Sequence, residues 1–239
     1  MKTKNLHAAT LKVMLDKMTS HAGAAPHPGV AAILADMSRL SDSVGALATI
    51  AENFDPELSQ EARQARTMRA ASKLGGALPA VTERLSKLEA TTRQGFDLAF
   101  AQNSGLVQTE RAAEIRSHLK SLPDPGKRAL FLQELLKTGD NESLGAVIFA
   151  PAYLSGLDSV THSRFREQIE EQRLPELTKN REVFNELAGN LKTAVGAADN
   201  AVHIFSDPRK LADIEMRSKQ AAEAENRLNS SIAGPGGSL

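Results

Sequence analysis

Apolar residues spaced three or four positions apart constrain the fold of this chain more than any other feature. A first stripe of this kind consists of Val30, Ile33, Met37, Leu40, Val44, Leu47, Ala51 and Phe54. A mean spacing of 3.5 residues keeps a narrow apolar stripe on one side of a helix, as in a coiled coil or a long helical hairpin. The sequence therefore predicts a long heptad helix over residues 30–54 that packs against other helices.

The same spacing returns twice near the other end of the chain. The second stripe consists of Phe184, Leu187, Leu191, Ala194, Ala198, Ala201 and Phe205. The third stripe consists of Leu211, Ile214, Ser218, Ala221, Glu225, Leu228 and Ile232. Two of its members, Ser218 and Glu225, are polar, and polar side chains weaken a helix seam. We expect the third stripe to pack less tightly than the other two.

The remaining apolar residues form shorter patterns of the same type, and no segment alternates in the way of a strand. Aromatic residues make up only 4% of the chain, whereas alanine, leucine and the long polar residues that favour helices are abundant. The predicted fold is all-α, an elongated bundle of antiparallel, coiled-coil-like helices without a sheet. More than about half of the residues should be helical, against about a third in an average protein.

Proline and glycine predict where these helices begin and end. The chain contains three Asp-Pro dipeptides, in which Asp can cap a helix whose first residue is Pro, and each predicts a helix start: Asp55-Pro56, Asp124-Pro125 and Asp207-Pro208. Gly75-Gly76 and Gly105 predict helix ends, and Pro175 should kink or divide a long helix over residues 159–205. Residues 20–29, with two prolines, predict a flexible connector.

These breaks suggest a division of the chain into three parts. An N-terminal helical region over residues 1–104 contains the heptad helix 30–54. A C-terminal helical region over residues 105–233 contains the kinked helix 159–205. Residues 234–239 form a tail rich in glycine that we expect to be flexible, because such termini are poorly ordered unless something holds them.

The segment 141–157, called the elbow below, is unusually apolar. Pro151 forces its predecessor out of helical geometry and Gly156 offers a stop, which predicts two short apolar helices joined at a bend. Two interpretations remain open. Burial in the core is favoured, because monomers seldom expose a large apolar patch. If the elbow is exposed, Phe149, Tyr153 and Leu154 are the candidate partner-binding residues.

A run of cations offers a second candidate site. Arg63, Arg66, Arg69 and Lys73 are spaced by three, three and four residues, so they lie on one face of a helix. They could bind an anion such as a phosphate backbone. A solvated helix face is the favoured interpretation, because no aromatic residues are interleaved to stack on bases. The net charge of zero likewise makes nucleic acid the less favoured partner.

Motifs that would indicate chemistry are not found in the sequence. The chain has no cysteine, and its six histidines never stand four residues apart, the spacing that lets two imidazoles hold one zinc ion. It also lacks the Gly-x-Ser-x-Gly motif of hydrolases, the phosphate-binding loop and the Gly-x-Gly-x-x-Gly dinucleotide loop. We therefore predict a protein that is not an enzyme and has no catalytic residue, metal or cofactor.

A structural or assembly protein that acts through helix–helix packing fits this pattern best. Its partners would be copies of itself or other subunits of a larger particle, for example as a scaffolding or accessory component of a phage virion. The alternative is a helical regulatory module that binds nucleic acid or another anion through Arg63–Lys73.

The expected location follows from what the sequence lacks. The polar start does not resemble a signal peptide, and the longest apolar run has nine residues, too few to cross a membrane. A cytoplasmic or virion-associated location is expected.

Overall fold

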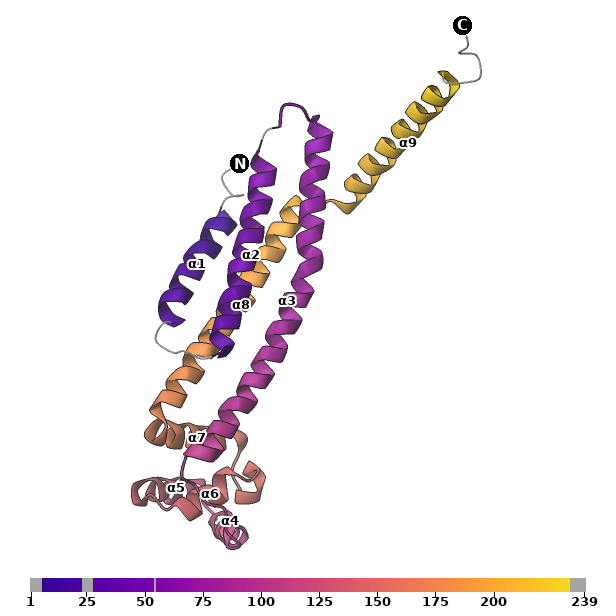
Figure 1. Cartoon of the computed structure of the whole chain (residues 1–239). Coiled ribbons are helices and arrows are strands. Elements are labelled where there is room, and N and C mark those ends of the chain that lie inside the picture. The colour runs from indigo at the N-terminus through magenta and orange to yellow at the C-terminus, as the bar shows by residue number, and fades with distance from the viewer. Residues whose placement is uncertain (1–5, 23–27, 54, 233–239) are drawn as a thin grey trace. The chain divides into compact units, whose positions relative to one another are not determined.

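The computed structural model describes residues 6–22, 28–53 and 55–232. Helices account for 87% of them and no strand occurs among them, which confirms the all-α fold (Figure 1). The described helices are α1 (Leu6–Ala22), α2 (Pro28–Glu52), α3 (Gln60–Asn103), α4 (Ala112–Ser121), α5 (Pro125–Thr138), α6 (Asn141–Ile148), the short 3₁₀ helix η1 (Ala152–Ser155), α7 (Ser159–Arg173), α8 (Pro175–Phe205) and α9 (Pro208–Ile232). Phe54, residues 23–27 of the predicted connector and the tail 234–239 lie outside the described residues, whereas the ends of the connector, residues 20–22 and 28–29, belong to α1 and α2.

The chain forms two compact units. Unit 1 comprises Met1–Lys87 together with Glu186–Leu239, and unit 2 comprises Leu88–Asn185. Both boundaries fall inside helices, because α3 and α8 each contribute residues to both units. The division at residue 104 suggested by the sequence coincides instead with the end of α3 at Asn103.

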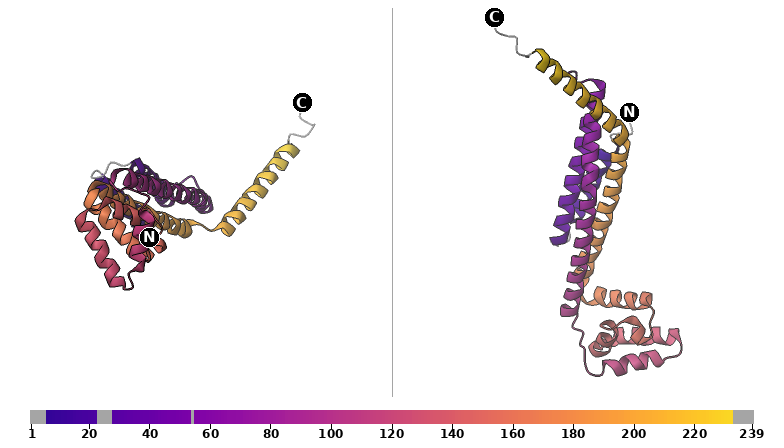
Figure 2. Two further views of the ribbon diagram at one scale, coloured as in Figure 1. Left: turned by 90° about the horizontal axis from the view of Figure 1, so that it is seen from below. Right: turned by 90° about the vertical axis from the view of Figure 1, so that its right-hand side faces the viewer.

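In unit 1 the first two stripes are covered by the chain's own helices. The first stripe lies on α2, where Val30, Ile33, Met37, Leu40, Val44 and Leu47 are at most 4% exposed. On α8, the members of the second stripe from Leu187 to Ala201 are at most 2% exposed. Figures 1 and 2 show α2 antiparallel to the first part of α3, with α8 alongside. The predicted heptad helix is therefore confirmed, and it packs within one chain.

Unit 2 is built around a separate core of nine buried side chains from α3 to α7: Phe100, Leu119, Leu132, Leu135, Leu144, Val147, Ile148, Phe165 and Ile169. The loop after α3 crosses α6 at Gly145. A Cβ at this glycine would lie 2.2 Å from the carbonyl oxygen of Val107, a distance that real Cβ atoms do not show. Glycine is therefore required where this loop meets α6.

Two of the three predicted Asp-Pro starts are confirmed. Asp124 accepts a hydrogen bond from the Gly126 amide at 3.0 Å where α5 begins, and Asp207 accepts one from the Lys210 amide at 3.0 Å where α9 begins. The start predicted at Asp55-Pro56 is wrong. Asp55 accepts from the Glu57 amide within a turn, and α3 begins only at Gln60, where Ser59 accepts from the Ala62 amide.

The predicted helix end at Gly75-Gly76 is also wrong, because α3 continues through both glycines and through Pro79. Gly75 serves close packing instead, since a Cβ there would approach Cγ1 of Val202 on α8 to 3.0 Å. The other predicted breaks are confirmed. Gly105 takes a left-handed conformation (φ 71°) just after α3, and Pro175 divides the helix predicted over 159–205 into α7 and α8.

Candidate functional site

The elbow, residues 141–157, forms two short helices joined at a bend, as the sequence predicts, and its two helices differ in exposure. Leu144, Ala146, Val147 and Ile148 of α6 are buried in the core of unit 2. In η1, by contrast, Tyr153 is 69% and Leu154 39% exposed. The interpretation as core thus holds for α6, whereas η1 presents two uncovered apolar side chains.

Phe149, at the end of α6, lies between these extremes. Its ring is partly buried and packs edge-on against Phe100, with the ring centroids 6.3 Å apart. The residue therefore contributes to the core of unit 2, and of the three candidate docking residues only Tyr153 and Leu154 are exposed.

The cation run of α3 is partly neutralised by the chain's own carboxylates. Arg69 donates to Glu215 of α9 at 2.8 Å, and Arg66 lies 3.8 Å from Asp55. Arg63 is half-buried and Lys73 is exposed. Because two of the four cations already face carboxylates, an anion would have to compete for them. Of the four, Arg69 also links α3 to α9.

A second ion pair completes this attachment of α9 to α3. Arg217 of α9 lies 3.3 Å from Glu61 of α3 and 3.4 Å from Asp213 of its own helix. Ile214, between these pairs, is 8% exposed. The first turns of α9 are therefore fixed to unit 1.

The rest of α9 is uncovered. Every described residue from Glu215 to Ser231 is exposed, including Met216 at 54% and Leu228 at 58%. The third stripe was expected to pack less tightly than the others, and in the described part of the chain it is buried at Ile214 alone. The result is a long helix that presents its stripe to solvent.

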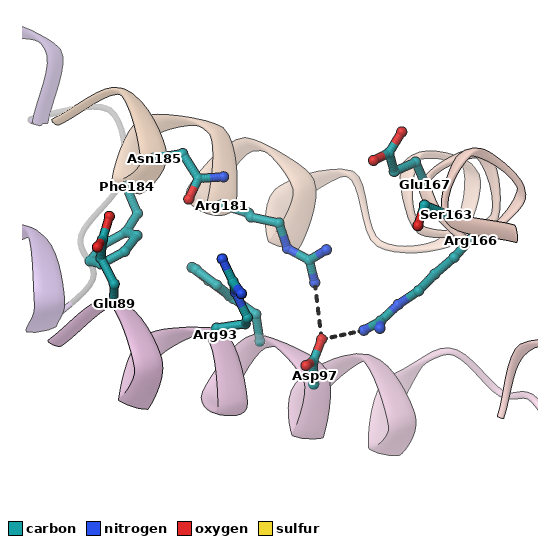
Figure 3. A pocket seen from close by; sticks show the side chains of 10 residues that line it. Glu89, Arg93, Asp97, Ser163, Arg166, Glu167, Arg181, Phe184 and Asn185 are labelled. Carbon is teal, nitrogen blue, oxygen red and sulfur yellow. Dashed lines mark hydrogen bonds and ion pairs between the residues drawn. The ribbon is translucent and has the colours of Figure 1, made fainter. Parts of the chain in front are cut away.

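A charged pocket in unit 2, which the sequence did not indicate, brings together side chains from α3, α7 and α8 (Figure 3). Asp97 accepts a hydrogen bond from Arg166 and lies 4.0 Å from Arg181. These residues are up to 84 positions apart in the chain and belong to no local motif. The cavity beside them has a volume of about 440 Å³ and is also lined by Arg93, Glu89 and Glu167.

Behind this pocket lies a buried carboxylate. Glu170 is 2% exposed and forms an ion pair with Arg181 at 2.9 Å. Burial raises the pKa of Glu170 above its ordinary value of about 4.5, because the protein interior disfavours the charged form, although Arg181 and Arg166 act in the opposite direction.

Both arginines are also positioned by aromatic rings. The Arg166 guanidinium lies 4.8 Å from the centroid of the Phe100 ring, and that of Arg181 lies 5.6 Å from Phe96. Two guanidinium groups and two carboxylates thus neutralise one another, which is the arrangement of a structural network. Among the described residues, no group of three or more acidic or histidine side chains is placed to hold a metal ion.

Comparison with protein-family models, characterised proteins and solved structures finds no match to this chain. Within the described part of the chain, no helix is both long and apolar enough to cross a membrane.

Proposed function

We propose that this chain is a non-catalytic structural protein that enters an assembly by packing α9 against the α9 helix of a second copy. The observation that carries the proposal is the exposure of the whole helix from Glu215 to Ser231, although the apolar spacing of the third stripe continues along it. A phage virion is the kind of particle in which we expect such a scaffolding or accessory subunit, with a cytoplasmic or virion-associated location.

The first two stripes leave α9 as the surface that fits this role. Both are buried inside the single chain, so they are not available to a second molecule. The uncovered part of α9 has 17 residues, and isolated helices of about that length are marginal in water. A second helix packed along the stripe would remove Leu228 and Ala221 from water and stabilise α9.

The internal charge pairing of unit 2 supports a role in packing over one in chemistry. Arg166, Arg181, Asp97 and Glu170 form ion pairs with one another, so this polar cluster of unit 2 is engaged in contacts within the fold. Arg69 of the cation run and Glu61, both on α3, similarly pair with Glu215 and Arg217 of α9.

Sedimentation of the full chain over a wide concentration range tests the proposal with two matched variants. Leu228→Lys places a charge on the stripe, and Met216→Lys places one at a similarly exposed position on the other side of α9. We expect the unmodified chain and Met216→Lys to dimerise and Leu228→Lys to stay monomeric, with a loss of helix content by circular dichroism no larger than the uncovered part of α9 accounts for. An unmodified chain that is monomeric at every concentration, or a Leu228→Lys variant that dimerises normally, would contradict the proposal.

A further inference from the structure

We infer that the two α9 helices pair antiparallel, with Ala221 of each opposite Glu225 of the other. The inference rests on the proposed self-association and adds its geometry. It follows from where the uncovered stripe begins, from the position of its one acidic residue and from the charge nearest to that residue.

The uncovered stripe continues an interface that already exists within the chain. Ile214 is buried where α9 is held against α3 by the pairs Arg69–Glu215 and Arg217–Glu61. Ala221 and Leu228 follow Ile214 by seven and fourteen residues, about two and four helical turns, and so lie on the same face. A second helix along this face extends a packing surface beyond the point where α3 covers it.

Glu225 distinguishes the two orientations of such a pair. It lies eleven residues after Ile214, about three turns, and therefore on the stripe itself. In a parallel pair in register, each stripe residue faces its own copy, and two Glu225 carboxylates would meet in a partly desolvated contact. Like charges in such a place are strongly unfavourable, so the parallel pair is disfavoured.

The antiparallel pair separates these carboxylates and places each near a cation of the other copy. When Ala221 faces Glu225 of the other copy, Ser218 faces Leu228, and the two Glu225 side chains lie on opposite sides of the centre. Arg217 is one turn before Ala221 and 52% exposed; it pairs with Glu61 and Asp213 in its own chain, and in this register the other copy's Glu225 lies one turn further along the same face. No described residue of the same chain pairs with Glu225. Each copy therefore places a cation, already shared between two carboxylates of its own chain, one turn from the other copy's Glu225.

Engineered thiols can measure the orientation, because the chain contains no cysteine of its own. Ser218→Cys and Leu228→Cys are prepared as two proteins of different tag length, and each is oxidised mildly alone and in a mixture. Antiparallel pairing predicts a disulfide-linked mixed dimer at least about tenfold more abundant than either self-linked dimer, because disulfides form only between closely spaced Cβ atoms. Efficient self-linking of Ser218→Cys alone would overturn the inference in favour of a parallel pair.

The sedimentation experiment separates failure of the orientation from failure of the proposed function. Dimers that sediment normally but form no mixed disulfide overturn the antiparallel register alone. A chain that never dimerises overturns both proposals.

A charge-removing variant examines the role of Glu225 directly. Glu225→Leu should bind its copy at least about tenfold more tightly and lose the preference for mixed disulfides, because an apolar residue no longer discriminates the orientations. Glu223→Leu, on another face of α9, serves as the matched control and should keep the preference. A Glu225→Leu variant that retains the full preference would show that Glu225 does not set the orientation.

Discussion

The first and third stripes have the same spacing and opposite environments. On α2, six large apolar residues from Val30 to Leu47 are at most 4% exposed. On α9, every residue from Glu215 to Ser231 is exposed. The difference follows the composition of the stripes, since Ser218, Ala221 and Glu225 replace large side chains on α9 and bury less apolar surface against a neighbour. Spacing identifies a helix face, and side-chain size and charge determine whether the same chain covers it.

The largest expected effect compares one substitution on both stripes. Leu40→Glu buries a charge on α2 and should lower the free energy of unfolding by at least about 3 kcal/mol, because a carboxylate without a partner is costly in the apolar core. Leu228→Glu on α9 should change the stability of the monomer by less than about 0.5 kcal/mol. Urea titration followed by circular dichroism measures both.

Ala32→Glu, at an exposed position of α2, is the control for this pair and should resemble Leu228→Glu. If Leu40→Glu lowered the free energy of unfolding no more than its control does, the result would contradict the burial of the first stripe.

Two helical glycines allow a covered position to be compared with an open one. Gly145→Ala should destabilise unit 2 by about 1–3 kcal/mol, because the new methyl group meets the Val107 carbonyl and the loop must shift. Gly76→Ala has no atom within 4 Å of the new Cβ and should stabilise α3 by up to about 1 kcal/mol, since alanine favours helix. Thermal denaturation of both variants checks the opposite signs; equal shifts would argue against the close crossing at Gly145.

Within the elbow, Phe149→Ala and Tyr153→Ala compare a partly buried aromatic side chain with an exposed one. Phe149 packs against Phe100, so its truncation should cost about 2 kcal/mol, less than for a fully buried ring. Tyr153 is 69% exposed and its truncation should leave the melting temperature nearly unchanged. A melting temperature that falls equally in the two variants would show that η1 belongs to the core as well.

Much of the fold could be predicted because its signals are local. The spacing of Val30 to Leu47 and the Asp124-Pro125 cap depend on residues within one helix, and both predictions are confirmed. The predictions at Asp55-Pro56 and Gly75-Gly76 failed because neighbours decide the outcome. Ser59 provides the cap of α3, and Val202 packs so closely on Gly75 that a Cβ there would lie 3.0 Å from its Cγ1.

The candidate surfaces were less predictable for the same reason. The exposure of Tyr153 and of α9 depends on which elements pack over them. The network of Asp97, Arg166 and Arg181 joins three helices, and no short pattern in the sequence relates these residues. Sequence spacing could therefore identify the third stripe but could not show that α9 is uncovered.

The smallest expected effect concerns the buried carboxylate of Glu170, and it appears in the free energy of unfolding only as pH is varied. Burial raises the pKa of Glu170 in the folded protein above its ordinary value of about 4.5. Between the ordinary and the raised value, the folded state binds more protons at this site than the unfolded state does. The contribution of Glu170 to stability is therefore fully present below the ordinary value and is lost as pH rises through the raised one.

Glu170→Gln removes this titration and reveals its sign. We expect the free energy of unfolding of the unmodified chain, relative to that of Glu170→Gln, to fall as pH rises from about 4 to 7. Asp140 and Asp158 act in the opposite sense, because capping hydrogen bonds lower their pKa values, so only the difference between variants isolates Glu170. A difference that rises with pH would show that the ion pair with Arg181 outweighs the cost of burying the carboxylate.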